Sequence, residues 1–323
     1  MVIKEYVPER FTYASADGVS EIAAYAYIPD EGEYRGIVQI VHGMSEYFLR
    51  YSAFCEFLCE KGFIVCGNDH IGHGYTSRSE EELGYTSEKD GAEILASDVN
   101  MLSNIIKERF PRLPHVLLGH SMGSLIARYC ISVYPDITDS CIIMGTVGPE
   151  SPARIAKLLA GLNARMFGEY NRSKFIKSLA FGSYNKKFKD EGSESAWISS
   201  IESVVDAYDR DPLAGFTFTA RGYYDLFDLL ARVSTKKWAE SIDKELPIFV
   251  VFGKNDPVGN YGVGALKVCE MLYAAGVKNM RYKIYPQSRH EILCDIEKDR
   301  VYDDLYGWIN GICEKMTEKS DEE

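Results

Sequence analysis

A serine flanked by two glycines is the feature of this sequence that most directly suggests chemistry. Ser121 lies in a Gly-His-Ser-Met-Gly pentapeptide at 119–123, directly after the apolar run 116–118. The segment that follows, 124–134, has a helical pattern. On a tight turn between a strand and a helix, small neighbours leave room for the turn and the serine Oγ is exposed. The pattern therefore predicts that Ser121 is a nucleophile.

A serine hydroxyl becomes an effective nucleophile when a general base takes its proton and a carboxylate orients that base. Where the nucleophile lies on such a turn, the chain order is serine, acid, histidine. Asp256 follows the apolar run 248–252, and His290 follows the run 280–285. His290 is also the only one of the six histidines that comes after Ser121. We expect Ser121, Asp256 and His290 to form a catalytic triad.

Other aspartates compete with Asp256 for the role of the acid. They are Asp206, Asp209, Asp211, Asp225, Asp243 and Asp295. Only Asp256 stands shortly after a predicted strand and before the histidine, which favours it. An aspartate that precedes a proline is also common in turns, so a purely structural role is the alternative.

Acyl transfer requires two backbone N–H donors for the oxyanion that forms on the substrate carbonyl. The residue after the nucleophile, Met122, is expected to supply one of them. The second should come from a loop after an early strand, and Val-His-Gly-Met at 41–44 fits such a loop. A simple strand-ending turn is the alternative for this segment. Because the segment 41–44 occurs in the same chain as the nucleophile turn, we favour Met44 as the second donor.

Asp69, His70 and His73 are the one cluster in the sequence that suggests a metal ion. The cluster is glycine-rich, follows a strand, and has no nearby cysteine or glutamate to complete a site. We interpret it as a loop stabilised by internal hydrogen bonds. The sequence has neither a dinucleotide-binding glycine pattern nor a Gly-x-x-x-x-Gly-Lys-Ser/Thr loop. We therefore expect no metal and no cofactor.

Short apolar runs alternate with helical segments along most of the chain. Nearly continuous β-branched runs, typical of parallel strands buried on both faces, lie at 36–41, 63–66, 116–118, 141–144 and 248–252. Helical patterns lie at 51–61, 92–110, 124–134 and 264–275. An opening pair of strands is expected at 11–13 and 21–28. This order predicts an α/β fold, with a mostly parallel central sheet flanked by helices.

The alternation stops between 149 and 241, where helix formers replace the β-branched runs. We interpret 149–241 as a helical cap inserted over the carboxyl edge of the sheet, where α/β sheets bind ligands. The core is then formed by 1–148 and 242–323. Most apolar side chains of the cap are expected to pack onto the core. Phe216 and Phe218 are our candidates for the lining of an apolar acyl pocket.

Composition narrows the classes of partner. The 323 residues suffice for one large α/β domain with an insertion, and the net charge of −12 argues against binding nucleic acid through a basic face. The eight cysteines form no Cys-x-x-Cys pair, which favours reduced, buried thiols and a cytoplasmic location. The first ten residues lack the apolar segment of a signal peptide, and no transmembrane segment is expected.

Four motifs in this order resemble the monoacylglycerol lipase and lysophospholipase group of α/β-hydrolases, which is also called serine aminopeptidase-type after its peptidase relatives. They are His-Gly-Met-Ser-Glu at 42–46 with Arg-Tyr at 50–51, Asp-His-Ile-Gly-His-Gly at 69–74, the pentapeptide at 119–123, and Gly-Lys-Asn-Asp-Pro-Val at 253–258 with His-Glu at 290–291. The resemblance implies the α/β-hydrolase fold. Ser124 stands where the group often has glycine, and Arg289 where it commonly has a small residue.

Together these features predict a serine hydrolase that cleaves a small ester with an apolar acyl chain, such as a monoacylglycerol or lysophospholipid, through an acyl-enzyme. Three alternatives stay open. The first is a short-chain carboxylesterase. The second is a peptidase of the aminopeptidase type, with Glu202, Asp206, Asp209 or Asp211 holding the substrate amine. The third is an inactive binding protein on the same fold, against which the intact set of serine, aspartate and histidine argues.

Overall fold

The computed structural model describes residues 6–30, 32–149 and 152–322, and an eight-stranded sheet forms its centre. The strand order is β1-β2-β4-β3-β5-β6-β7-β8. The strands are β1 (Glu9–Ala14), β2 (Glu21–Tyr27), β3 (Gly36–Val41), β4 (Phe63–Asn68), β5 (His115–His120), β6 (Ser140–Met144), β7 (Ile248–Gly253) and β8 (Met280–Tyr285). β2 runs antiparallel to both β1 and β4, and all other pairs are parallel.

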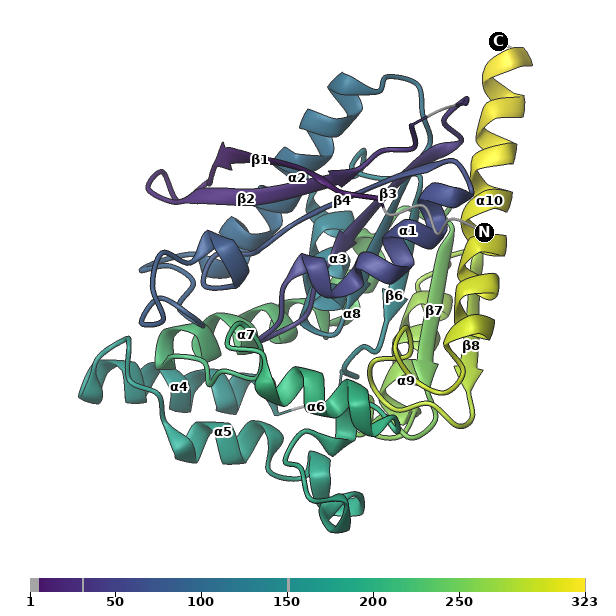
Figure 1. The fold of residues 1–323 in the computed structure, drawn as a ribbon. Coiled ribbons are helices and arrows are strands. Elements are labelled where there is room, and N and C mark those ends of the chain that lie inside the picture. The colour runs from purple at the N-terminus through teal and green to yellow at the C-terminus, as the bar shows by residue number, and fades with distance from the viewer. Residues whose placement is uncertain (1–5, 31, 150–151, 323) are drawn as a thin grey trace.

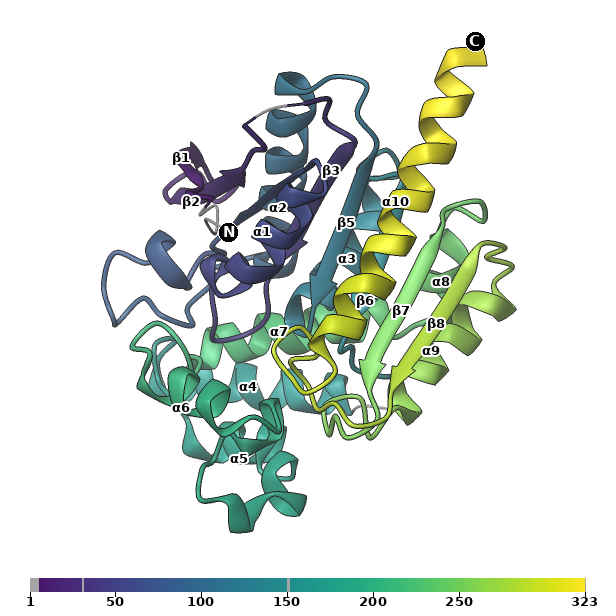
Figure 2. The same ribbon diagram turned by 45° about the vertical axis from the view of Figure 1, so that its right-hand side comes forward.

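Helices cover both faces of this sheet (Figures 1 and 2). They are α1 (Ser52–Glu60), α2 (Gly91–Arg109), α3 (Met122–Val133), α9 (Val263–Ala274) and α10 (Lys298–Glu322). α1 and α10 lie on one face, where Val116 and Leu118 of β5 share a buried cluster with them. Leu117 points to the other face and packs in the cluster that includes α2, α3 and α9. This alternation is the two-residue period of a strand buried on both sides.

The predicted fold class is confirmed, because every residue of β3 to β7 is buried and helices separate the parallel strands. The predicted strands and core helices differ from the observed ones mainly at their ends. The sequence analysis did not predict α10. Its buried residues Val301, Leu305 and Ile309 recur every four positions among charged residues, which is the pattern of one narrow apolar stripe.

Between β6 and β7 the described chain forms five α-helices, and the first four of them lie below the carboxyl ends of the strands in Figures 1 and 2. The five helices are α4 (Ala153–Phe167), α5 (Lys174–Phe181), α6 (Glu202–Arg210), α7 (Ala220–Val233) and α8 (Lys236–Ser241). α7 packs directly on the core, because Phe227 and Leu230 share a buried cluster with Leu125 of α3. The cap that we propose spans 149–241, of which residues 150–151 lie outside the described residues. Residues 1–5, part of the segment predicted not to be a signal peptide, also lie outside them.

Each of the eight cysteines is a free thiol, and all except Cys294 are buried. Burial raises the pKa of the Cys141 thiol to about 12, so this side chain is an apolar core residue at neutral pH. Within the described part of the chain, no helix has both the length and the apolar character that crossing a membrane requires.

Candidate active site

Ser121 lies at the tip of the turn between β5 and α3. Its backbone angles are φ 54° and ψ −120°, a combination that non-glycine residues rarely adopt. The Ser121 amide donates a 3.0 Å hydrogen bond to the carbonyl of Met144. A Cβ on Gly119 would overlap the Gly123 carbonyl, and one on Gly123 would overlap the Val41 carbonyl. The glycines are therefore required because the strand, the turn and α3 approach one another so closely.

His290 and Asp256 lie in the loops that follow β8 and β7, and they form a buried pair. Nδ1 of His290 lies 2.9 Å from Oδ2 of Asp256. The Val258 amide donates a 2.8 Å hydrogen bond to the other carboxylate oxygen and fixes its orientation. Because a carboxylate only accepts, Nδ1 carries the proton and Nε2 remains an acceptor. His290 and Ser121 line the same cavity, and Asp256 is joined to it through its hydrogen bond with His290.

Met44 and Met122 line this cavity beside Ser121. Met122 is the first residue of α3, so its amide precedes the first hydrogen bond inside the helix. The Gly43 carbonyl accepts a 2.8 Å hydrogen bond from Nδ1 of His42. Because a trans peptide places its C=O and N–H on opposite sides, the Met44 amide points away from the His42 ring. Both predicted oxyanion donors thus lie at the cavity wall.

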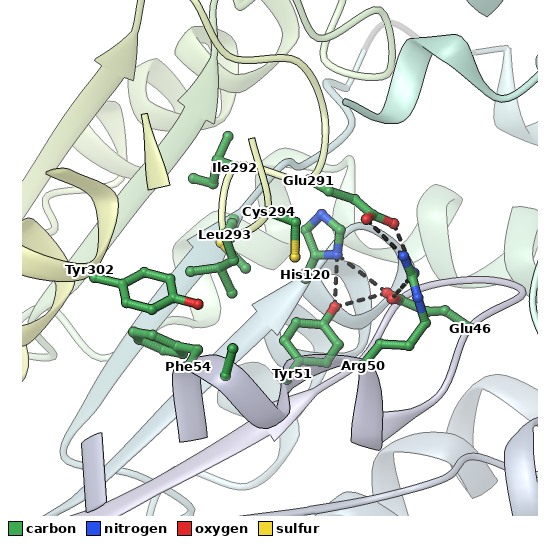
Figure 3. Close-up of a pocket in the computed structure, with 12 residues that line it drawn as sticks. Glu46, Arg50, Tyr51, Phe54, His120, Glu291, Ile292, Leu293, Cys294 and Tyr302 are labelled. Atoms are coloured by element: carbon green, nitrogen blue, oxygen red, sulfur yellow. Dashed lines mark hydrogen bonds and ion pairs between the residues drawn. The ribbon is translucent and has the colours of Figure 1, made fainter. Parts of the chain in front are cut away.

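Figure 3 shows a network of five polar side chains, one of which, Glu46, belongs to the predicted oxyanion loop 43–46. Arg50 donates to Glu46 Oε2 at 2.9 Å and to both carboxylate oxygens of Glu291 at 2.8 Å. Tyr51 donates from its hydroxyl to Glu46 Oε1 at 2.8 Å. Since Glu291 follows His290 in the chain, Arg50 ties the oxyanion loop to the loop of the base.

The charges in this network are set by burial and by close partners. Burial alone would raise the pKa of Glu46, but the hydrogen bond from His120 and the charge of Arg50 hold that pKa well below its usual range. Burial alone would lower the pKa of His120, but the hydrogen bond and charge of Glu46 raise it. Nε2 of His120 donates to the His290 carbonyl at 3.3 Å. His120 is therefore a support for the base loop, a role that the sequence analysis missed.

A large cavity of about 1400 Å³ lies between the carboxyl edge of the sheet and the cap. Its apolar lining includes Leu125, Val147, Phe216, Leu226, Phe227 and Leu230. Of the two predicted pocket residues, Phe216 lines the cavity, whereas Phe218 has no exposed surface. Phe218 instead stacks behind Phe216, with the ring centroids 6.1 Å apart, and packs on His73.

Two cap contacts on the base loop were not found from the sequence. The ring of Trp197 lies 5.1 Å from the ring of His290 and shields it. Arg289 donates to the carbonyls of Ala196 and Ser199 at 2.6 and 3.0 Å. Arg289 is one of the two departures from the family motif noted above. Its hydrogen bonds connect the loop that carries His290 to the cap.

Ser124, the other departure from that motif, supports the nucleophile turn. Its hydroxyl lies 2.5 Å from the Ser121 carbonyl and 2.8 Å from the hydroxyl of Thr146. Thr146 in turn accepts a 3.2 Å hydrogen bond from the buried guanidinium of Arg128. The serine therefore connects the nucleophile turn to the loop after β6.

The segment around Asp69, His70 and His73 is held by hydrogen bonds, some within the segment as expected and others with the neighbouring residues His42 and Phe48. Asp69 accepts from the amides of Phe48 and Tyr75 at 2.9 and 2.8 Å. Burial lowers the pKa of His73 to about 3, so its ring is neutral. Among the residues that the structure describes, no group of three His, Cys, Asp or Glu side chains is placed to hold a metal ion.

Comparison with known proteins agrees with the fold. The profile of the family described as serine aminopeptidase, S33, matches residues 32–297, and the chain belongs to this family. It is 25% identical over 298 residues to a monoacylglycerol lipase of Mycolicibacterium smegmatis, which covers 92% of this chain and 95% of that protein.

Solved structures with the same fold include an esterase and a lipase. A thermostable carboxyl esterase from Bacillus coagulans superposes with a TM-score of 0.89 at 30% identity, over 95% of this chain and 99% of that one. A lipase in its open form gives a TM-score of 0.85 at 25% identity, over 96% and 99%. The chain is thus an α/β-hydrolase, and its predicted resemblance to the monoacylglycerol lipase-like group is confirmed.

Proposed function

We propose that this protein hydrolyses carboxylic esters of monoacyl lipids, monoacylglycerols or lysophospholipids, through a triad of Ser121, His290 and Asp256. The named activities of the relatives above are carboxylic ester hydrolyses, which makes this chain an ester hydrolase of the α/β-hydrolase family. The observation that carries the finer proposal is one large cavity that Ser121 and His290 share with an apolar cap surface.

The mechanism follows from the hydrogen bonds of the site. His290 Nε2 takes the proton of Ser121 as Oγ attacks the ester carbonyl, and Asp256 stabilises the imidazolium. The amides of Met44 and Met122 bind the oxyanion. His290 then protonates the leaving alcohol, and the acyl group stays on Ser121. A water molecule, deprotonated by His290, releases the fatty acid and restores the serine.

The size and lining of the cavity support a long acyl chain. Pockets for drug-sized ligands measure about 300–1000 Å³, and this one has about 1400 Å³. Each buried methylene contributes about 0.8 kcal/mol, so the apolar part of this mixed lining favours long chains over short ones. Contrary to the expectation that most apolar side chains of the cap pack onto the core, α4 and α5 expose large ones, at Ile155, Leu158, Met166, Phe167 and Phe175. The substrate that we propose is therefore a small ester with an apolar acyl chain.

The aminopeptidase alternative is less well supported by the carboxylates around the cavity. A substrate amine would need a carboxylate that is free to pair with it. Glu46 and Glu291 are already paired with Arg50. Of the four acidic residues predicted for this role, only Asp209 lines the cavity, and it accepts a 2.6 Å hydrogen bond from Ser193. Glu194, which was not predicted for this role, also lines the cavity and is exposed, so the substrate panel below includes aminoacyl substrates.

The test is a substrate panel that runs from acetyl to oleoyl esters and includes monoacylglycerols, lysophosphatidylcholine and aminoacyl anilides. We expect kcat/KM to rise with acyl length and to peak on long-chain monoacyl lipids. The Phe216→Ala variant should shift that optimum, because the ring lines the cavity. Activity confined to acetyl and butyryl esters would contradict the lipid substrate, and cleavage of anilides alone would establish the peptidase.

A further inference from the structure

Ser45 of the proposed oxyanion loop 43–46 is hydrogen-bonded to the cap. Its hydroxyl donates a 2.7 Å hydrogen bond to the Phe216 carbonyl, and its own carbonyl accepts a 2.9 Å hydrogen bond from the Gly215 amide. The Tyr208 hydroxyl donates to the same Ser45 carbonyl at 3.4 Å. Ser45 is 5% exposed, so these bonds are shielded from water.

The backbone of Ser45 is in an unfavourable region, with φ at 54°. A residue with a Cβ adopts this conformation when surrounding contacts hold it there. The hydrogen bonds that hold Ser45 in this conformation are made with Gly215, Phe216 and Tyr208, which all belong to the cap. The shape of the oxyanion loop therefore depends on where the cap segment 214–216 lies.

Met44 stands between two anchors. On the core side, Gly43 donates from its amide to Glu46 Oε1 at 2.5 Å, and its carbonyl accepts from His42. On the cap side, the anchor is Ser45. The direction of the Met44 amide is thus fixed by a core anchor and a cap anchor together.

We propose that Ser45 is a positioning residue through which the cap segment 214–216 holds the Met44 amide in the oxyanion hole. The proposal rests on the proposed role of Met44 as an oxyanion donor. It has a consequence for the choice of substrate, because the ring of Phe216 lines the cavity while its carbonyl is bonded to Ser45. An acyl chain that packs on this ring stabilises the segment that orients the donor, so binding energy from the chain appears in kcat.

The test uses Ser45→Ala and Ser45→Gly. Both remove the hydroxyl, but glycine also relieves the strain of the positive φ. If the hydroxyl positions the loop, kcat should fall about tenfold in both, a fraction of the 10²–10³-fold that loss of a whole donor costs. KM should change little. Full activity of Ser45→Gly would overturn the proposal, because strain alone would then explain the alanine variant.

The control is Ser132→Ala, which removes a serine hydroxyl that donates to a backbone carbonyl, that of Tyr129, at 2.6 Å on α3. Ser132 does not line the cavity. This variant should keep the kcat and KM of the wild type. All three variants should show thermal unfolding midpoints close to that of the wild type, which separates positioning from a general loss of stability.

A second readout reports on the oxyanion itself. A long-chain trifluoromethyl ketone adds to Ser121 and forms an oxyanion, whereas the corresponding ether binds the cavity without one. Affinity for the ketone should fall in Ser45→Ala by the same factor as kcat/KM, and affinity for the ether should not. Equal ketone affinity in Ser45→Ala and wild type would overturn this inference alone. A wild type that neither cleaves esters nor binds the ketone would overturn the proposed function with it.

Discussion

Nδ1 of His290 and Oδ2 of Asp256 lie 2.9 Å apart, in a pair of residues that are each at most 3% exposed. This bond fixes the tautomer that leaves Nε2 of His290 as an acceptor. A proton on Nε2 would prevent the histidine from acting as a base. In the proposed mechanism, this pair therefore determines whether Ser121 can be activated.

Replacing Asp256 by Asn should reverse that tautomer, because the amide can donate to Nδ1. We expect kcat on the best ester to fall about 10⁴-fold with little change in KM. Steady-state kinetics would measure this. Asp243→Asn, an exposed aspartate outside the site, is the matched control and should keep full activity. Equal rates for the two variants would contradict the role of Asp256.

Arg50→Met should lower the free energy of unfolding by about 3–5 kcal/mol, because the carboxylates of Glu46 and Glu291 stay buried without their cation. The Arg50 side chain is 14% exposed. The control is Arg210→Met. Its side chain is 80% exposed and pairs with Asp206 on the helix surface, so its loss should cost no more than about 0.5 kcal/mol. Urea denaturation of both variants measures the difference, and equal losses would contradict the network.

Gly123→Ala should reduce stability by about 3 kcal/mol or more, because its Cβ would meet the backbone carbonyls of Val41 and His42, which cannot move aside. The matched control is Gly307→Ala on α10, where a Cβ would meet no atom within 4 Å. That variant should gain roughly 0.5–1 kcal/mol from helix propensity. Thermal unfolding of both variants gives the comparison. A tolerated alanine at 123 would show that the turn is looser than described.

Asp98 on α2 should make stability depend on pH. Burial raises the pKa of this carboxyl from 3.8 to about 7, although it accepts hydrogen bonds from Ser15 and the Ala16 amide. The folded state therefore binds the proton more tightly than the unfolded chain, so the free energy of unfolding should decrease as the pH rises from 3.8 to about 7. Asp98→Asn should remove this part of the slope. Parallel pH curves for wild type and variant would contradict the assignment.

Local patterns were sufficient for the core and for the candidate triad. The apolar run before Ser121 and the glycines around it report a strand and a tight turn within a few residues. The chain order of the hydrolase turn then picks out Asp256 and His290 from among several competitors. These inferences need no knowledge of how distant segments pack.

The supporting contacts depend on the topology, and for that reason the sequence analysis missed them. Arg50 and Glu291 are separated by 241 positions, and Ser45 and Phe216 by 171. Nothing local marks such partners. Likewise, Phe216 and Phe218 are two positions apart with similar surroundings in sequence, yet only the packing of the cap decides that Phe216 lines the cavity.

The central claim is that Ser121 carries the acyl group during ester hydrolysis. The most direct measurement is rapid acid quenching of turnover on a long-chain monoacylglycerol, followed by mass spectrometry of peptides. We predict an acyl adduct on the peptide that contains Ser121, and a loss of turnover of at least about 10³-fold in Ser121→Ala. Full ester hydrolysis by Ser121→Ala, or an adduct on another residue, would contradict the account.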